Sequence, residues 1–245
     1  DRRQRQMCIR DSLIAAWKYL KAWKLTEKEL LDMMNQLFIR GYKQLRDDSM
    51  IREIENRRSI RKYKPDELDR KLIEDIIYSA SLAPSAKNRQ PWKFIVYQGE
   101  EKDKLVDVMR NGINSEKTTH ELMPEWAFAI PDAENTVRIM KEVPCLIAVL
   151  NTNQHTPFAS IENEKRIVEI CDSLSIGAAI ENMILTATGY GLGTLWIANT
   201  CFAYNELMEF IGTDIQLTGI VAVGFADEAP VKRPRKLLEE IVEYR

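Results

Sequence analysis

The longest helical pattern in the sequence spans residues 162–190, and it constrains the fold more than any other stretch of the 245-residue chain. Small residues stand midway along it at 177–179, and small residues allow the backbone of another element to approach closely. The pattern predicts a helix that lies at the centre of the fold or packs at a dimer interface. Its apolar side chains recur on one side at helical spacing: Ile167, Ile170, Leu174, Ala178 and Ile184.

A glycine-rich segment, Gly-Tyr-Gly-Leu-Gly at 189–193, ends this helical pattern, and the apolar residues 194–198 follow it. The dinucleotide-binding fingerprint has the reverse order, in which a strand precedes the glycines and a helix follows them. A Rossmann-type site is therefore rejected. The glycines predict a C-terminal helix cap that leads into a strand.

The rest of the chain between residues 66 and 225 changes repeatedly between helical and strand patterns. Residues 112–143 show no regular pattern, and aromatic residues such as Trp126 and Phe128 are scattered through them. An irregular stretch of this length inside a domain is either disordered or a lid over a site, and the aromatic residues favour a lid. Helices are predicted at 66–81, 100–111 and 204–211, and strands at 94–97, 145–150 and 217–225.

The first 49 residues are predicted to form a helical extension of a domain that begins at Met50 and continues to the end of the chain. Residues 1–11 resemble a translated sequencing adapter and are left out of the fold. Two helical stretches follow at 12–45, and the second begins with a capping box at 26–29. They are interpreted as packing surface or as a docking helix pair. A membrane-surface helix is disfavoured, because it is expected to carry a one-sidedly basic polar face.

The charge and the cysteines exclude several classes of partner. The formal net charge of −2 provides no general basic field, so nucleic acid is disfavoured as a partner. No uninterrupted apolar run of about 18 residues occurs, and no basic-then-apolar leader opens the sequence, which disfavours a membrane span and secretion. The four cysteines form no C-x-x-C pair, and they are interpreted as reduced structural thiols of a cytoplasmic protein in preference to a metal or redox site.

The pentapeptide Arg57-Arg58-Ser59-Ile60-Arg61 concentrates anion-binding groups just before the first strongly patterned helix. In an extended backbone, Arg57, Ser59 and Arg61 point to one face, and the other two residues point to the opposite face. Two guanidinium groups and a hydroxyl on one face suit a phosphate, because the planar guanidinium donates paired, charged hydrogen bonds. The alternative is a solvated basic surface.

A polar loop, Ala-Pro-Ser-Ala-Lys-Asn-Arg-Gln-Pro-Trp at 83–92, joins the helix predicted at 66–81 to a strand. Its Ser, Asn and Gln residues are ordinary turn formers. A loop between a helix end and a buried strand is also a place where ligands tend to bind. A second basic cluster lies at 230–236, before a final amphipathic segment.

Four motifs, taken in order, resemble those of the nitroreductase family of FMN-dependent NAD(P)H oxidoreductases: RRSIRKY at 57–63, APSAKNRQPW at 83–92, the long helix into GYGLGTLW at 189–196, and PRKLLEEI at 234–241. The resemblance runs from about Met50 to the last residue. It implies an α+β fold in which a mixed or antiparallel central sheet is covered by helices. It also implies a homodimer, because the family builds its FMN sites across the subunit interface.

The resemblance implies FMN-binding positions in four segments: Arg57, Arg58, Ser59, Arg61, Pro84, Ser85, Asn88, Trp196, Ile197, Ala198 and Arg235. By position, Arg57 and Ser59 would hold the phosphate together with Arg235. Arg61 would lie near the flavin pyrimidine and stabilise the anionic reduced flavin. The amide of Asn88 would donate and accept hydrogen bonds at the uracil-like edge. Backbone groups around the last three positions of the strand would reach flavin atoms N5 and O4.

No catalytic side chain and no metal is expected, because FMN itself would accept hydride from NADH or NADPH and pass it to a nitroaromatic, a quinone or a similar small electrophile. The two histidines, His120 and His155, lie outside the motifs and are interpreted as surface or lid residues. One alternative is a related flavin enzyme that reduces enones, removes halogens or cleaves the flavin. Another is a flavin-binding interaction protein without significant turnover.

Overall fold

The computed structural model describes residues 52–245. The helical extension predicted at 1–49, the domain start predicted at Met50, and Cys8 lie outside the described residues. Within residues 52–245, no helix combines the length and the apolar character that crossing a membrane requires.

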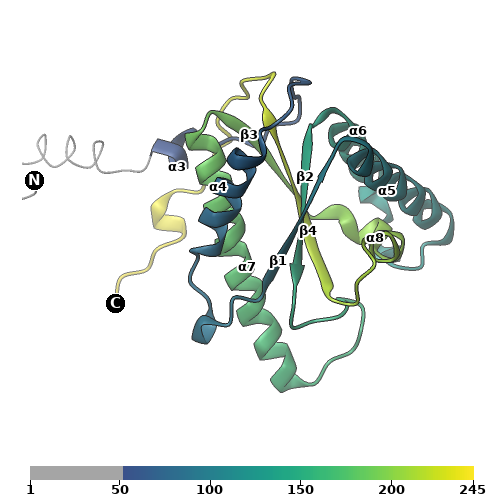
Figure 1. Ribbon diagram of the computed structural model, residues 1–245. Coiled ribbons are helices and arrows are strands. Elements are labelled where there is room, and N and C mark those ends of the chain that lie inside the picture. Colours follow the sequence, from purple (N-terminus) through teal and green to yellow (C-terminus); the bar gives the residue numbers. More distant parts are fainter. Residues whose placement is uncertain (1–51) are drawn as a thin grey trace, which may run out of the picture. The chain divides into compact units, whose positions relative to one another are not determined.

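A four-stranded antiparallel sheet lies at the centre of the fold (Figure 1). Its strands are β1 (Trp92–Gln98), β2 (Cys145–Asn151), β3 (Leu192–Ile197) and β4 (Gln216–Phe225), in the spatial order β1-β2-β4-β3. All three pairings are antiparallel. The predicted α+β fold is confirmed, and of the two predicted kinds of sheet the antiparallel one is observed.

Helices cover both faces of the sheet (Figure 1). α4 and α7 pack together on one face, and α5, α6 and α8 lie on the other. The helices are α3 (Arg52–Asn56), α4 (Arg70–Ser81), α5 (Gly99–Thr119), α6 (Ile130–Glu142), α7 (Asn163–Gly189) and α8 (Tyr204–Ile211), with short 3-10 turns at Ala86–Asn88, Pro124–Ala129, Asn199–Ala203 and Leu238–Glu240.

Each face of the sheet has its own apolar core, because successive side chains of a strand point to opposite faces. Along β2, Ile147 and Val149 belong to the core under α4 and α7, whereas Leu146 and Ala148 belong to the core under α5, α6 and α8. All seven residues of β2 are buried. A continuous apolar strand of this kind is what a sheet covered on both faces requires.

The stretch 112–143 is mostly helical, so the prediction that it is irregular is wrong. α5 and α6 together cover most of it, and 120–129 alone contains no α-helix. The apolar repeat of α5 is interrupted in the sequence, because the buried apolar residues Met109 and Ile113 are followed on the same side by the buried but charged Glu116. Its carboxylate accepts hydrogen bonds from two backbone N–H groups of the following loop, so a charged residue stands where the pattern calls for an apolar one.

The side of α7 predicted to be apolar and packed is exposed in its first half. The exposed fractions of Ile167, Ile170 and Leu174 are 62%, 48% and 71%. Apolar residues occur on two sides of this helix, and periodicity does not reveal which side the sheet takes. The side that packs on the sheet is formed by Ile176, Ala179, Ile180, Met183, Ile184 and Ala187.

The predicted glycine cap at the end of this helix is confirmed. α7 ends at Gly189, and β3 begins at Leu192. Gly191 adopts a left-handed conformation with a φ of 76°, and its N–H donates to the carbonyl of Thr188 at 2.9 Å. A residue without Cβ adopts this conformation at little cost, so the chain turns sharply from helix into strand.

Alkaline pH is expected to destabilise the fold through Cys145. Burial raises the pKa of this thiol to about 12, whereas an exposed thiol has a pKa of about 8.5. Below the lower value both states keep the proton, and stability is unaffected. As the pH rises between the two values the unfolded state alone loses the proton, so the free energy of unfolding falls, by about 3 kcal/mol at pH 11.

Urea unfolding at pH 8, 9.5 and 11 measures this effect. Cys145→Ala serves as the control, because it removes the thiol and should reduce the slope of stability against pH above pH 9. Tyr63 is expected to contribute to the remaining slope. Its pKa is raised by burial first and by the nearby Glu228 second, against the opposing effect of Arg61. Identical slopes in the wild type and in Cys145→Ala would contradict the assignment.

Candidate functional site

The middle of the segment 57–61 pairs with the free edge of β3. Ser59 forms a parallel bridge with Thr194, and the N–H of Ile60 donates to the carbonyl of Thr194 at 2.9 Å. Ile60 is buried, whereas the residues on either side of it are half-buried. The close approach requires Gly193, because a Cβ at that position would come within 2.7 Å of the Ile60 side chain. The extended backbone predicted for residues 57–61 is observed at Ser59 and Ile60, whereas the N–H of Arg57 donates to the carbonyl of Glu53 at 2.8 Å, a helical hydrogen bond.

The three arginines of this segment have different partners. The Nε of Arg57 lies 3.5 Å from a carboxylate oxygen of Glu181 on α7. Arg58 is tied to the end of α3, where its Nη1 donates to two backbone carbonyls at 2.7 and 2.8 Å. The backbone N–H of Arg61 donates to the carboxylate of Glu228, and its Nη1 donates to a carbonyl of its own segment at 3.2 Å. The guanidinium groups of Arg57 and Arg61 thus keep donors for an anionic ligand.

The polar loop after α4 has a strained backbone. Lys87, Asn88 and Gln90 adopt left-handed conformations with φ angles of 54°, 54° and 48°, which cost about 1 to 2 kcal/mol for a residue with a side chain. The hydroxyl of Ser85 accepts a hydrogen bond from the N–H of Gln90 at 3.0 Å, and its carbonyl accepts one from the N–H of Asn88 at 2.9 Å. Ser85 therefore shapes the loop, while Pro84 and Asn88 are exposed.

Arg89 ties this loop to α7. Its Nε and Nη2 donate to Oδ1 of Asp172 at 3.1 and 2.7 Å. The other oxygen of that carboxylate accepts from the side-chain amide of Asn153 at 3.0 Å, and Asp172 is completely buried. The hydrogen bond to Asp172 raises the pKa of Arg89, which is charged at physiological pH in any case.

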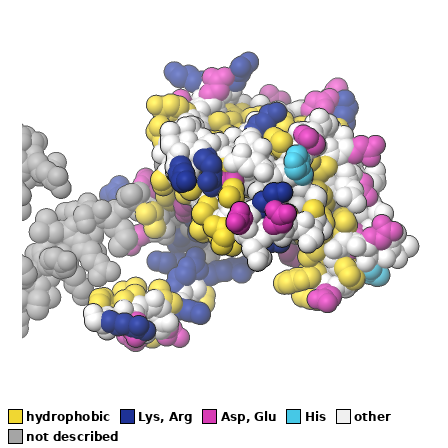
Figure 2. Space-filling model, turned by 90° about the horizontal axis from the view of Figure 1, so that it is seen from below, with side chains coloured by type: hydrophobic (Ala, Val, Ile, Leu, Met, Phe, Trp, Pro, Cys, Tyr) yellow, Lys and Arg dark blue, Asp and Glu magenta, His cyan; other side chains and the backbone are white. Residues whose placement is uncertain are grey.

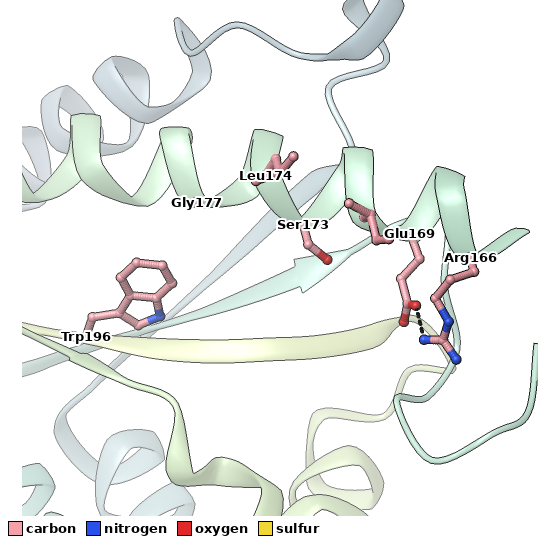
Figure 3. Close-up of a pocket in the computed structure, with 7 residues that line it drawn as sticks. Arg166, Glu169, Ser173, Leu174, Gly177 and Trp196 are labelled. Carbon is pink, nitrogen blue, oxygen red and sulfur yellow. Dashed lines mark hydrogen bonds and ion pairs between the residues drawn. The ribbon is translucent and has the colours of Figure 1, made fainter. Parts of the chain in front are cut away.

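An open groove lies between α7 and the end of β3 (Figure 3). The Trp196 side chain rises from β3 toward α7, and Ser173 and an ion pair between Arg166 and Glu169 extend from α7 toward the same space. The volume of this α7 groove is about 570 Å³. The groove is lined by Arg166, Glu169, Ile170, Ser173, Leu174, Gly177 and Trp196.

The predicted strand 194–198 ends one residue earlier, at Ile197, and its last three predicted positions differ in exposure. Trp196 is 46% exposed, the side chain of Ile197 is buried in the core, and Ala198 is exposed. Among residues 52–245, β3 is an outer strand of the sheet, and its backbone groups on the side away from β4 have no neighbouring strand to pair with beyond the bridge at Ser59. Ile197 is therefore able to serve a ligand only through its backbone.

α7 and the adjoining β3 gather three of the four predicted segments. Arg57 contacts α7 through an ion pair, the polar loop contacts it through Arg89, and Trp196 faces it across the groove. Arg235 is the exception, because among the described residues its side chain contacts only two carbonyls of its own segment, at 3.3 and 3.4 Å. A meeting of Arg235 with Arg57 and Ser59 stays a prediction.

Three charged residues at these contacts are absent from the predicted set: Arg89, Asp172 and Glu181. Asp172 carries a signal that the sequence already contains, since a lone carboxylate among the apolar residues of a long helix needs a buried partner. The sequence does not reveal which residue is that partner.

Within residues 52–245, no group of three or more His, Cys, Asp or Glu side chains is placed to hold a metal ion. Both histidines are exposed, as predicted.

A sequence model of the nitroreductase family matches residues 54–225. The chain is 28% identical over 198 residues to an iodotyrosine deiodinase of Thermotoga neapolitana, a match that covers 77% of this chain and 93% of that protein.

Solved structures agree with the sequence match. A nitroreductase-like family protein from Bacillus cereus is 26% identical, with a TM-score of 0.59 over 79% of this chain and 94% of that one. The FMN-dependent nitroreductase NfnB of Mycobacterium smegmatis, solved in complex with NADPH, has a TM-score of 0.62 and 18% identity over 79% of this chain and 96% of that one, and so shows the shared fold. With the family match over most of its described length, this chain belongs to the nitroreductase family.

Proposed function

We propose that this protein is an FMN-dependent oxidoreductase that transfers hydride from NADH or NADPH to a small electrophile such as a nitroaromatic or a quinone. The observation that carries the proposal is the convergence on α7 and β3. Residues 57–61 and the polar loop, far apart in the sequence, each form an ion pair with α7, and Trp196 lines an open groove beside the same helix. Membership of the family supports the same reading.

The residues present fit FMN. Arg57 and Arg61 offer cationic donors, and Ser59 between them offers a hydroxyl, as a phosphate and an electron-rich ring require. The ion pair of Arg57 with Glu181 is long, at 3.5 Å, so a doubly charged phosphate is able to replace or join the carboxylate. The α7 groove, at about 570 Å³, lies within the size range of small-molecule sites.

FMN, when bound, supplies the redox chemistry, taking hydride from the nicotinamide and delivering it to the acceptor. The protein's part is binding and orientation. Arg57 and Ser59, with Arg235, would hold the phosphate. Arg61 places a positive charge beside the flavin pyrimidine, and Asn88 offers an amide to the ring edge. The backbone at the free end of β3 offers N–H groups without a competing strand.

We propose that the protein acts as a homodimer through the exposed face of α7. This face presents Ile167, Ile170 and Leu174 beside the exposed Trp196, and large exposed apolar surfaces of this kind mark interaction sites. A second copy is the natural occupant, because its own apolar face matches this one under twofold symmetry. The placement also sets the groove at the junction of two subunits.

The C-terminal segment supports a second copy as well. Leu237, Leu238 and Tyr244 are exposed by 61%, 65% and 94%, although they are apolar or aromatic. Figure 2 shows basic and hydrophobic side chains side by side on this segment. A chain end with this composition gains from lying against another surface.

A cytoplasmic location stays a prediction, and the free thiols of Cys145 and Cys201 agree with it.

Reductive removal of a halogen is the second candidate reaction, and the 28% identity to an iodotyrosine deiodinase over 93% of that protein favours it. It uses the same cofactor chemistry with a halogenated phenol as the acceptor. The choice between the two reactions depends on residues that meet the acceptor rather than on those that hold FMN.

The test is an absorbance spectrum of the purified protein after incubation with FMN and removal of the free flavin. We expect retained flavin absorbance that NADH or NADPH bleaches under anaerobic conditions. A nitroaromatic or a quinone should then restore the colour. A protein that retains no FMN would overturn the proposal. Rapid reoxidation by halotyrosine, with none by nitroaromatics or quinones, would favour the second candidate.

A further inference from the structure

We propose that Arg89 and Asp172 form a positioning pair, which holds the polar loop after α4 in the shape that presents Asn88 to the flavin. The inference rests on the proposed function, because it concerns how the cofactor site is kept in order. It goes beyond that function by assigning a role to two residues outside the predicted cofactor contacts.

The loop needs an external restraint. Among the described residues four non-glycine positions have a positive φ, and three of them are Lys87, Asn88 and Gln90. Strained backbone of this kind persists only where the surroundings fix it. The hydrogen bonds that Ser85 accepts from within the loop fix its curvature but do not attach it to the rest of the domain.

Arg89 supplies the attachment. It is the one residue between positions 87 and 90 with a right-handed conformation, at φ −69° and ψ −25°. Its guanidinium makes two hydrogen bonds to the same oxygen of Asp172, with 30% of the side chain exposed. Other contacts from the loop to the domain are weaker or lie at its ends, such as that of the Ala86 N–H to the Ser175 hydroxyl at 3.4 Å.

Asp172 is anchored in the domain by contacts other than that with Arg89. It is completely buried on α7, and its second oxygen accepts from the side-chain amide of Asn153. The backbone N–H of Asn153 donates in turn to the side chain of Asn151, the last residue of β2, at 3.1 Å. The carboxylate is therefore buried and hydrogen-bonded through both oxygens, and it anchors Arg89 to the domain.

The geometry explains why a buried carboxylate with a partly exposed arginine partner is present at all. Replacing such a pair with apolar residues of similar volume is often neutral or stabilising, so stability alone is a weak reason for a buried carboxylate. A better reason is that the pair fixes the backbone on each side of Arg89 and so orients Asn88. The exposed side chain of Asn88 accepts one hydrogen bond, from the side-chain amide of Gln90 at 3.3 Å.

The experiment compares the wild type with Arg89→Met, with the double variant Arg89→Met/Asp172→Leu, and with Arg89→Lys. Thermal unfolding reports the fold, and fluorescence titration reports the dissociation constant of FMN. Hydrogen exchange at the amides of Asn88 and Gln90 in the flavin-free protein reports the loop directly. The midpoint potential of bound FMN reports whether the ring edge is still contacted as in the wild type.

Arg89→Met is expected to be destabilised, because it leaves the buried carboxylate without its cation. The double variant should recover the unfolding temperature of the wild type. Its FMN dissociation constant should nevertheless stay raised by about tenfold, which corresponds to about 1.4 kcal/mol. The two loop amides should exchange at least tenfold faster than in the wild type, and the midpoint potential should move.

A double variant that recovers stability, FMN affinity and slow exchange together would overturn the inference and leave a purely structural pair. Arg89→Lys keeps the inference testable if the double variant does not fold. A lysine retains the charge but contacts the carboxylate through a single nitrogen. It should raise the FMN dissociation constant severalfold, and an unchanged constant would overturn the inference. A wild-type protein that binds no FMN would overturn the proposed function as well.

Discussion

Leu174→Glu is expected to leave the protein monomeric and to weaken FMN binding at least tenfold. Leu174 is the most exposed of the three apolar side chains on the free face of α7. In a twofold symmetric dimer the substitution places two carboxylates in one contact, where each loses water without gaining a partner. FMN binding falls with the dimer, because the α7 groove that Leu174 lines would lose its second wall.

Light scattering coupled to size-exclusion chromatography measures the mass, and flavin titration of the same fractions measures affinity. Tyr78→Glu is the matched control, because Tyr78 is a large side chain of similar exposure that lies on α4 and does not line the α7 groove. The control should stay dimeric. A Leu174→Glu protein that is dimeric at the same concentrations as the wild type would move the interface to another surface.

Arg235→Ala is expected to raise the dissociation constant of FMN by about tenfold to a hundredfold and to change that of riboflavin far less. FMN and riboflavin differ in the phosphate alone. A charged hydrogen bond to a phosphate contributes about 1.5 to 3 kcal/mol, and each 1.4 kcal/mol is a factor of ten. Arg235 contacts only two backbone carbonyls at long distance among the described residues, so its guanidinium remains available to an anion.

Fluorescence quenching with both flavins measures the two constants. Arg233→Ala is the matched control, two residues earlier in the same exposed segment, and it should have a much smaller effect. Equal losses of FMN and riboflavin affinity in Arg235→Ala would show that this arginine does not meet the phosphate. A loss confined to FMN would place the C-terminal segment at the site with Arg57.

The elements that the sequence predicts well are those whose signals are local. The apolar run of β2 and the glycine turn between α7 and β3 both depend on a few neighbouring residues, and both are observed. The part of α5 beyond residue 111 was missed because Glu116 interrupts its apolar side. That carboxylate is satisfied by the loop that follows, which a helical pattern does not include.

The free face of α7 shows a different limit. Its apolar residues satisfy the same helical spacing as those that pack on the sheet, so Leu174 and Ile180 are equivalent to a periodicity argument. The difference arises from which side meets β2 and β4, and this is a property of the whole fold. An apolar face left over after folding is informative only once the buried face is known.

The candidate site likewise contains residues that the sequence predicts and residues that it does not. Motifs identify Arg57, Ser59 and Asn88 as candidates, because each stands in a short characteristic segment. The partners of these segments, Glu181 and Asp172, lie on a helix far along the sequence. Neither residue type nor local spacing specifies such a pairing. It follows from the packing of α7 against the sheet, which brings the segments of Arg57 and Asn88 to one helix.

The edge pairing of residues 57–64 also determines when the site is able to form. Ile60 bonds to Thr194, and the N–H of Lys64 donates to the carbonyl of Phe225 at 2.9 Å, so an early segment is ordered by the last two strands of the sheet. Contacts between distant positions form late, because closing a long loop costs entropy before any contact is gained. During synthesis the ribosome therefore releases the arginine segment long before β3 and β4 exist to receive it. A nascent chain halted before Phe225 should capture no flavin, so cofactor loading would serve as a check that translation of the domain is complete.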